Sequence, residues 1–231
     1  THPERLCELV RELGADVGLA FDGDADRLMA VDERGKIVNG DQIMCICANH
    51  LKSQGRLRGN TLVTTIMSNM GLDLALKKLG IQQVKTKVGD RYVLENMLEN
   101  NYSLGGEQSG HVIFLDYNTT GDGLITALQL LTVMVESKKS LSRLAQIMEV
   151  LPQSQYAARV TDARKHDFDK DEEIVSAIHS LEKKYEGRGR VLVRASGTEP
   201  FVRIMIEGPD QKEMDQDVYT LAKLIERKLN A

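Results

Sequence analysis

The spacing of apolar residues changes repeatedly along residues 1–150, and each change predicts a switch between strand and helix. Runs of aliphatic and β-branched residues predict buried strands, whereas apolar residues three and four positions apart predict amphipathic helices. The predicted strands are 17–21, 28–31, 62–66, 84–88 and 112–114. The predicted helices are 4–13, 41–51, 72–79, 91–100, 124–135 and 141–150. Alternating strands and helices indicate an α/β domain with a mostly parallel sheet.

The pattern changes after Leu151-Pro152, which is the best candidate for a domain boundary. The predicted strands beyond it are 156–160, 190–194 and 201–207, and the predicted helices are 172–184 and 209–229. Because two of these strands follow one another without an intervening helix, the order favours a smaller α+β domain. The predicted fold class is therefore α/β, with a mixed α/β domain followed by a C-terminal α+β domain.

Composition and charge exclude several classes of function. The chain has 231 residues, a formal net charge of −4, no tryptophan and 4% aromatic residues, which disfavours a nucleic-acid binder. Its most apolar run, 125–135, is too short for a membrane span, which needs about 20 residues. The three cysteines, Cys7, Cys45 and Cys47, form no disulfide framework or metal spacing, so we expect thiols in the reducing cytoplasm.

The segment 22–27, Asp-Gly-Asp-Ala-Asp-Arg, joins the first two predicted strands. Its aspartates are Asp22, Asp24 and Asp26. Small residues separate these carboxylates, so they can converge in a turning loop, where a hard divalent cation would relieve their repulsion. A solvated acidic turn is the alternative. An EF-hand-like calcium loop would also use Glu33, but Arg27 replaces its required glycine and strands flank the segment.

A second polar segment, Gly105-Gly-Glu-Gln-Ser-Gly-His111, is rich in glycine. Its glycines permit tight turns and the close approach of a ligand. Glu107 and Ser109 are two residues apart and can share one face, which suits hydrogen bonds to the neighbouring hydroxyls of a polyol. His111 is a candidate for proton transfer near neutral pH. A hairpin turn with incidental polar residues is the alternative.

A third segment, 194–200, joins the last two predicted strands and reads Arg-Ala-Ser-Gly-Thr-Glu-Pro. Guanidinium and hydroxyl groups, with backbone N–H groups around a glycine, can form a cradle for phosphate. The candidate phosphate-binding residues are Arg194, Ser196, Gly197, Thr198 and Arg203. An ordinary hairpin with salt bridges to Glu199 or Glu207 is the alternative.

The segments 22–27, 106–111 and 194–200 resemble the metal, sugar and phosphate loops of the α-D-phosphohexomutases, in that family's order and separations. The resemblance covers essentially the whole chain. Because the sequence begins without Met and the family has four domains, we expect the C-terminal part of a longer protein, without domain one and most of domain two. The implied domains are 1–36 (the end of domain two, with the metal loop), 37–150 (α/β sugar-binding domain three) and 151–231 (α+β phosphate-binding domain four).

The resemblance implies an isomerase that transfers a phosphoryl group through a phosphoserine and a sugar bisphosphate. Mg²⁺ would be bound by the three aspartates, and Arg27 would lie beside the metal and the phosphoryl group. Glu107 and Ser109 would hold sugar hydroxyls, and the phosphate-binding residues would hold the phosphate that is not being transferred. His111 is a candidate acid or base.

Within the family, the chain most resembles the members that interconvert glucosamine 6-phosphate and glucosamine 1-phosphate, for cell-wall amino-sugar synthesis. This resemblance lies in the segments 106–111 and 119–123. Mutases of mannose or glucose phosphates are one alternative. A non-enzymatic module that binds phosphosugar or Ca²⁺ is another. The family's nucleophilic serine lies in a Ser-His-Asn-Pro loop, which these 231 residues do not contain. The resemblance therefore implies that the chain alone is inactive and binds Mg²⁺ weakly.

Overall fold

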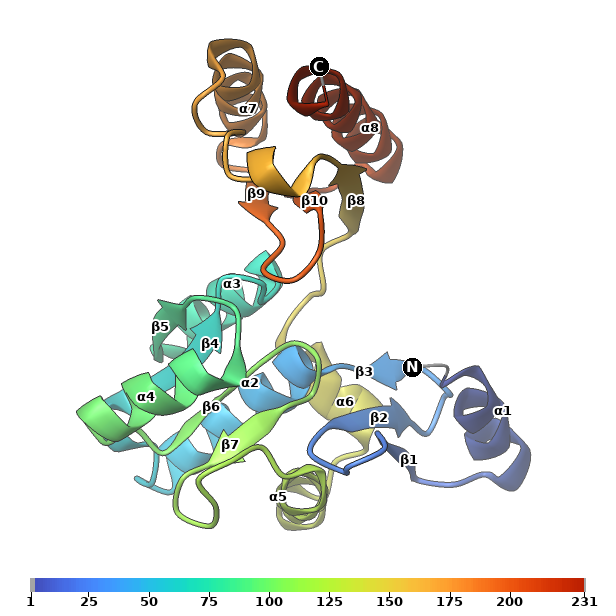
Figure 1. Ribbon diagram of the computed structural model, residues 1–231. Coiled ribbons are helices and arrows are strands. Elements are labelled where there is room, and N and C mark those ends of the chain that lie inside the picture. The colour runs from blue at the N-terminus through green and yellow to red at the C-terminus, as the bar shows by residue number, and fades with distance from the viewer. Residues whose placement is uncertain (1–2, 231) are drawn as a thin grey trace. The chain divides into compact units, whose positions relative to one another are not determined.

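The computed structural model describes residues 3–230 and divides the chain into two compact units (Figure 1). The first unit ends at Val150 and the second begins at Leu151. Each unit has a hydrophobic core of its own. Within the described residues, no helix is both long and apolar enough to cross a membrane.

The first unit opens with a helix and a three-stranded antiparallel sheet, in the order β1-β2-β3. These elements are α1 (Glu4–Leu13), β1 (Val17–Phe21), β2 (Leu28–Asp32) and β3 (Ile37–Val38). Gly14 ends α1 in the left-handed conformation (φ 61°), which a residue without Cβ adopts at little cost. The helix then lies close against β1, because a Cβ on Gly18 would come within 2.6 Å of Val10 Cγ2.

The larger part of the first unit is a four-stranded sheet with its helices (Figure 1). The strands are β4 (Thr61–Thr65), β5 (Gln82–Thr86), β6 (Leu104–Gly106) and β7 (Val112–Phe114), in the order β5-β4-β6-β7. The helices are α2 (Gly40–Ser53), α3 (Met70–Leu79), α4 (Asp90–Asn100), α5 (Gly123–Ser137) and α6 (Leu141–Leu144), with 3-10 turns η1 (Arg58–Asn60) and η2 (Ala145–Ile147). Because β4 is parallel to β5 and β6, and only β7 runs antiparallel, the expected mostly parallel sheet is confirmed.

Helices α2 and α4 cover opposite faces of this sheet. Leu62 and Val63 are successive residues of β4, so their side chains point to opposite faces. Leu62 belongs to the main core with the buried residues of α2, whereas Val63 packs with Val93 and Met97 of α4. Strands β4, β6 and β7 are therefore buried, whereas the edge strand β5 is partly exposed.

The prediction of a helix over 141–150 is wrong in its second half. The α-helix ends at Leu144, a 3-10 turn follows, and Met148 is already extended (φ −134°, ψ 148°). Residues Ala145, Ile147 and Met148 nevertheless pack on the main core. Their spacing therefore reflects burial of an irregular segment, which periodicity alone does not distinguish from a helix.

The short strand expected before the polar segment is β6, which also includes the two glycines that interrupt the apolar pattern. Both glycines are required by close packing. A Cβ on Gly105 would lie 2.6 Å from Met97 Sδ, and a Cβ on Gly106 would lie 2.4 Å from the carbonyl oxygen of His111. The glycines therefore allow neighbouring elements to approach the strand that leads into the polar segment.

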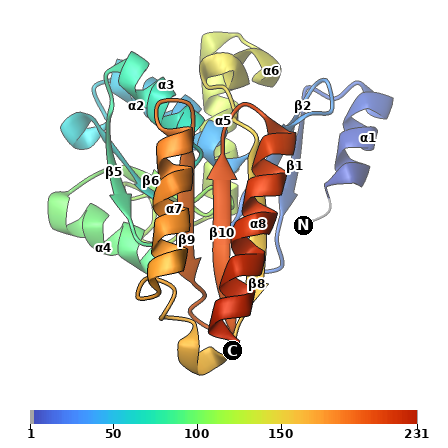
Figure 2. The ribbon, with the colours of Figure 1, turned by 90° about the horizontal axis from the view of Figure 1, so that it is seen from above.

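The second unit is a three-stranded antiparallel sheet with two helices packed together over one face (Figure 2). The strands are β8 (Gln153–Arg159), β9 (Arg190–Ala195) and β10 (Phe201–Glu207), in the order β8-β10-β9, and the helices are α7 (Glu172–Tyr185) and α8 (Gln211–Leu229), with a 3-10 turn η3 (Asp162–Arg164). Buried Met214, Val218, Leu221 and Ile225 give α8 the apolar stripe that packs on the sheet. The expected α+β architecture is confirmed.

Candidate functional site

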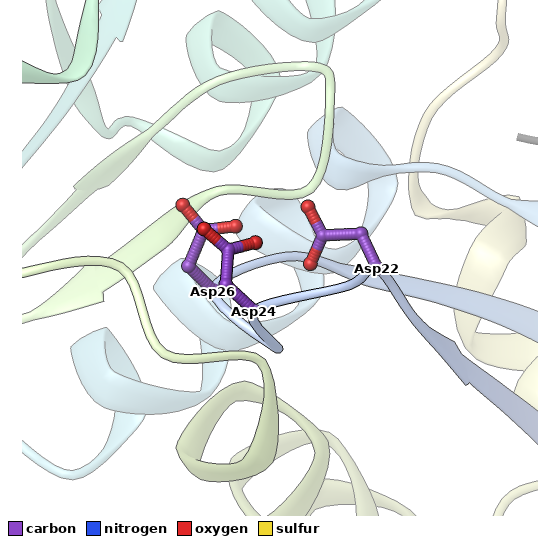
Figure 3. Close-up of side chains that lie close together, drawn as sticks. All are labelled: Asp22, Asp24 and Asp26. Atoms are coloured by element: carbon purple, nitrogen blue, oxygen red, sulfur yellow. The ribbon is translucent and has the colours of Figure 1, made fainter.

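The acidic segment 22–27 is the loop between β1 and β2, which pair with each other up to its two ends. Ala25 turns the chain in the left-handed conformation (φ 59°), and its N–H donates to the carbonyl oxygen of Asp22 (3.2 Å). The turn brings the side chains of Asp22, Asp24 and Asp26 together (Figure 3). One carboxylate oxygen from each lies within 4.8 Å of the others.

Arg27 offsets part of this negative charge. Its backbone N–H donates to Asp22 Oδ1 (3.2 Å), and its Nε lies 3.6 Å from Asp22 Oδ2 and 3.7 Å from Asp26 Oδ1. Desolvation raises the pKa of the Asp22 carboxyl, but the hydrogen bonds to it, led by the Arg27 backbone, outweigh desolvation and leave that pKa below its ordinary value. The Asp22 carboxylate is therefore charged at neutral pH.

The oxygen atoms of the loop fit a divalent cation. Asp26 Oδ1 is buried and accepts no hydrogen bond from any group within residues 3–230. Arg27 Nε, at 3.7 Å, is near this oxygen but makes no hydrogen bond to it. A buried carboxylate oxygen that accepts no hydrogen bond is costly, and a bound cation would remove that cost. Carboxylate oxygens are the ligands that Mg²⁺ and Ca²⁺ prefer in proteins.

The polar segment 107–111 connects β6 to β7 and is fixed to two neighbouring elements. The carbonyl oxygen of Gly110 accepts from the N–H of Leu28 (3.1 Å), and that of Gln108 accepts from the N–H of Gly40 (3.2 Å). Gly110 (φ 95°) is also required by close approach, because a Cβ there would lie 2.2 Å from the carbonyl oxygen of Leu28. These contacts hold the segment beside the first residue of β2, directly after the acidic loop.

The two sugar-binding candidates lie in this turn. Glu107 is half-buried, and its Oε1 accepts from the N–H of Gly89 at the start of α4 (3.1 Å). Ser109 is exposed. The turn therefore places one carboxylate at a strand-to-helix junction, where α/β proteins bind ligands, and leaves one hydroxyl in solvent.

His111 links the polar segment to the acidic loop. Its side chain is only 5% exposed, and its Nδ1 lies 3.0 Å from Asp26 Oδ2. Its backbone also forms an isolated antiparallel bridge with Arg27. The structure thus brings the predicted metal and sugar residues together in the first unit.

The phosphate-binding candidates form a cluster within the second unit. Arg194 and Arg203 are register partners on β9 and β10, so their side chains emerge on the same face of the sheet. Burial, and then the charge of Arg203, lower the pKa of the Arg194 guanidinium. Arg203 also forms an ion pair with Glu199. Two neighbouring guanidinium groups favour a bound anion, because they otherwise repel each other.

The loop between β9 and β10 adds hydroxyl and backbone groups to this cluster. Ser196 is buried, and its N–H donates to the carbonyl oxygen of Phe201 (2.8 Å). Gly197 and Thr198 are exposed, and their N–H groups donate to no acceptor within residues 3–230. These donors suit the oxygens of a phosphate group.

Lys165 also supports this loop, although no sequence motif includes it. Its side chain is 11% exposed, and its Nζ donates to the carbonyl oxygen of Gly197 (3.4 Å) and lies 3.0 Å from Asp162 Oδ1. A lysine in a charged stretch gives no sequence signal for such a contact. Lys165 thus connects the loop between β9 and β10 to Asp162 at the start of η3.

Three models of one family match the chain in order. Residues 2–35 match phosphoglucomutase/phosphomannomutase, alpha/beta/alpha domain II. Residues 39–151 match phosphoglucomutase/phosphomannomutase, alpha/beta/alpha domain III, and residues 156–222 match the C-terminal domain of the same family.

Curated relatives match at high identity. The chain is 58% identical over 229 residues to phosphoglucosamine mutase from Clostridium botulinum (strain Kyoto / Type A2), which covers 99% of this chain and 51% of that protein. It is 59% identical over 230 residues to phosphoglucosamine mutase from Thermoanaerobacter sp. (strain X514), which covers 100% of this chain and 52% of that protein. The chain therefore spans about half the length of the curated relatives it matches.

Solved structures share the fold. A phosphoglucomutase/phosphomannomutase family protein from Burkholderia thailandensis superposes with a TM-score of 0.77 at 20% identity, over 100% of this chain and 51% of that chain. N-acetylphosphoglucosamine mutase from Aspergillus fumigatus, in complex with GlcNAc-6P and magnesium, superposes with a TM-score of 0.75 at 19% identity, over 92% of this chain and 49% of that chain. With three successive models of one family matched along its length, the chain belongs to the phosphoglucomutase/phosphomannomutase family, the α-D-phosphohexomutases.

Proposed function

We propose that this chain forms the metal-, sugar- and phosphate-binding part of a phosphoglucosamine mutase, which interconverts glucosamine 6-phosphate and glucosamine 1-phosphate. Curated relatives that are 58% and 59% identical over nearly the whole chain have that name. The acidic loop is the observation on which the proposal depends. Three of its carboxylates converge within 4.8 Å, and the buried Asp26 Oδ1 has no hydrogen-bond partner within residues 3–230.

Asp22, Asp24 and Asp26 would hold Mg²⁺. The family is generally metal-dependent, and magnesium is named in the complex of the Aspergillus fumigatus relative. When bound, Mg²⁺ supplies positive charge that offsets the charge of the transferring phosphoryl group. Arg27, whose guanidinium lies beside two of these carboxylates, would orient the same phosphoryl group through its N–H donors.

The substrate would be held at two places. Glu107 and Ser109 would bind sugar hydroxyls, because a carboxylate accepts and a serine hydroxyl both donates and accepts hydrogen bonds. The phosphate that is not transferred would bind the cluster of the second unit, formed by Arg194, Ser196, Gly197, Thr198 and Arg203. The Aspergillus fumigatus relative was solved with the phosphosugar GlcNAc-6P, which supports a phosphosugar substrate here.

The proposed reaction moves one phosphoryl group at a time. The bond between the serine Oγ and phosphorus breaks as the free hydroxyl oxygen of the sugar phosphate bonds to that phosphorus. The proton of the hydroxyl ends on the freed serine Oγ, so the products are a sugar bisphosphate and an unmodified serine. The other phosphoryl group of the bisphosphate then returns to the serine. Resemblance to the family places that serine in a Ser-His-Asn-Pro loop. Since these 231 residues contain no such loop, we expect no turnover from them alone.

The names of the relatives favour the amino sugar over neutral hexoses, and Gln108 is the one residue of the polar segment that supports this preference by resemblance. We further propose that the reaction takes place in the cytoplasm. In support, Cys7, Cys45 and Cys47 are free thiols, as expected of a reducing compartment.

The test uses the protein expressed from the complete reading frame that contains these residues. With Mg²⁺ and a trace of sugar bisphosphate, turnover of glucosamine 6-phosphate is compared with that of glucose 6-phosphate and mannose 6-phosphate. We expect a strong preference for the amino sugar, and Asp24→Asn to lose at least about 100-fold in kcat. Asp16→Asn, at an exposed position before β1, is the matched control.

Other results would change the proposal in distinct ways. A preference for a neutral sugar would indicate a phosphomannomutase or phosphoglucomutase instead. Absence of turnover on all three sugars, with retained phosphosugar binding, would indicate a binding module.

A further inference from the structure

His111 is enclosed by two other segments of the first unit. It lies directly before β7, its carbonyl oxygen accepts from the N–H of Glu107 (2.9 Å), and its backbone bridges to Arg27. Only 5% of its side chain is exposed. The orientation of the ring is therefore set by the protein.

A backbone donor determines which ring nitrogen of His111 has the proton. The N–H of Gly121 lies 3.0 Å from Nε2. Because a backbone N–H can only donate, Nε2 accepts, and the neutral ring holds its proton on Nδ1. Nδ1 lies 3.0 Å from Asp26 Oδ2, so that proton is donated to the carboxylate. Both ring nitrogens thus have partners within the protein.

The same hydrogen bond selects the oxygen of Asp26 that faces a ligand. Oδ2 accepts from His111, whereas Oδ1 is buried and has no hydrogen-bond partner within residues 3–230. We propose that His111 is a positioning residue, which holds Asp26 by Oδ2 and thereby presents Oδ1 to a divalent cation in the acidic loop. This inference rests on the proposed function, because it takes the acidic loop as a metal site.

This role differs from the acid or base chemistry expected for His111 from the sequence. A group that transfers a proton to or from a substrate hydroxyl needs a nitrogen within hydrogen-bond reach of it. Here Nδ1 of His111 faces Asp26, whereas Nε2 faces the N–H of Gly121 and lies 3.9 Å from Asp90 Oδ2. Histidines and carboxylates paired in this way orient metal ligands and raise their basicity.

The segment that holds the ring also holds the acidic loop. A Cβ on Gly121 would lie 2.3 Å from His111 Nε2, so the backbone at Gly121 is packed directly against the ring. Two residues later, the N–H of Gly123 donates to the carbonyl oxygen of Ala25 (2.9 Å). Ring and loop are therefore fixed by one short stretch at the start of α5.

Two substitutions of His111 distinguish the hydrogen bond made by Nδ1 from the one made by Nε2. Asn places an amide nitrogen near the position of Nδ1 and keeps a donor for Asp26, whereas Gln reaches the position of Nε2 and does not. Binding of Mn²⁺ to the 231-residue chain is measured by electron paramagnetic resonance of the free ion. We expect His111→Gln to weaken Mn²⁺ binding about 10–100-fold, and His111→Asn to remain within about threefold of the unaltered chain. His50→Gln, in the last turn of α2, is the matched control.

The variant Asp24→Asn distinguishes failure of the proposed metal site from failure of the proposed positioning role of His111. If Mn²⁺ binds, and Asp24→Asn weakens this binding while His111→Gln leaves it unchanged, the positioning role is overturned and the metal site stands. Equal weakening by His111→Asn and His111→Gln also overturns the positioning role. If the chain binds no Mn²⁺, or Asp24→Asn leaves binding unchanged, the metal site itself fails, and the positioning role fails with it.

A measurement on the unaltered chain keeps the inference testable even if the variants unfold. Nitrogen-15 chemical shifts of the His111 ring report which nitrogen is protonated. We expect the proton on Nδ1 and none on Nε2. A ring protonated on Nε2 alone would overturn the inference, because His111 could not then donate to Asp26.

Discussion

Glu33 joins two segments of the first unit that are far apart in the sequence, and we predict that its charge stabilises that unit. Glu33 lies in the turn between β2 and β3. Its carboxylate accepts from the backbone N–H of Ser142 (3.1 Å) and from the Ser142 hydroxyl, 109 residues away at the start of α6. Burial raises the pKa of Glu33, but the hydrogen bonds from Ser142 outweigh burial and bring that pKa to about 2.

The size of the effect follows from this pKa. Compared with the ordinary value of 4.5, a pKa of about 2 corresponds to at most roughly 3 kcal/mol of stabilisation. Because 27% of the side chain is exposed, solvent screening reduces that value. We therefore expect Glu33→Gln to lower the free energy of unfolding of the first unit by about 1–3 kcal/mol at pH 7.

The pH dependence has a definite sign. The pKa of Glu33 is lower in the folded chain than its ordinary value, so the stabilisation is complete above pH 4.5 and is lost as the pH falls toward about 2. The difference in unfolding free energy between the unaltered chain and Glu33→Gln should therefore shrink across this range.

Urea unfolding followed by circular dichroism, from pH 7 to pH 3, measures this difference. The transition of the first unit is identified at pH 7 by thiol labelling, because Cys7, Cys45 and Cys47 are buried and all lie in that unit. Glu99→Gln, at an exposed position on α4, is the control. No destabilisation by Glu33→Gln at pH 7, or the same destabilisation at pH 3, would refute the reasoning.

Three further predictions concern buried groups. Burial raises the pKa of Cys47 to about 12, so its thiol should resist a disulfide reagent at pH 8 until urea unfolds the first unit, as mass spectrometry would show. Gly71→Ala would place a Cβ 1.7 Å from the carbonyl oxygen of Glu149. Urea unfolding should therefore show that this variant lowers the free energy of unfolding of the first unit by about 1–3 kcal/mol. Tyr185→Phe removes the hydrogen bond from the buried hydroxyl to Asp217 (2.7 Å), and calorimetry should show the second unit destabilised by about 1–2 kcal/mol.

Local chemistry could be predicted from the sequence, because each loop holds its functional groups within a few residues. The acidic loop was recognisable from the alternation of Asp22, Asp24 and Asp26 alone. The contacts that complete each site could not be predicted in this way. His111 and Asp26 are 85 residues apart, and Lys165 and Gly197 are 32 residues apart. Only the folded backbone brings these pairs together, and neither member of a pair identifies the other.

The same distinction applies to the fold. Regular elements with one buried face, such as α8, could be predicted because burial repeats with the period of the helix. The segment 145–148 could not, since its apolar residues are buried from irregular backbone. The extent of strand β6 could not be predicted, because Gly105 and Gly106 allow close approach of neighbouring elements and have low strand propensity.

Anomalous diffraction from crystals of the chain soaked with Mn²⁺ would locate the cation directly. We predict one peak at the acidic loop, within about 2.0–2.6 Å of carboxylate oxygens of Asp22, Asp24 and Asp26, including Asp26 Oδ1. His111 should still donate to Asp26 Oδ2 in those crystals. A peak bound to a nitrogen of His111, or no peak at this loop, would contradict the metal site on which the proposed function depends.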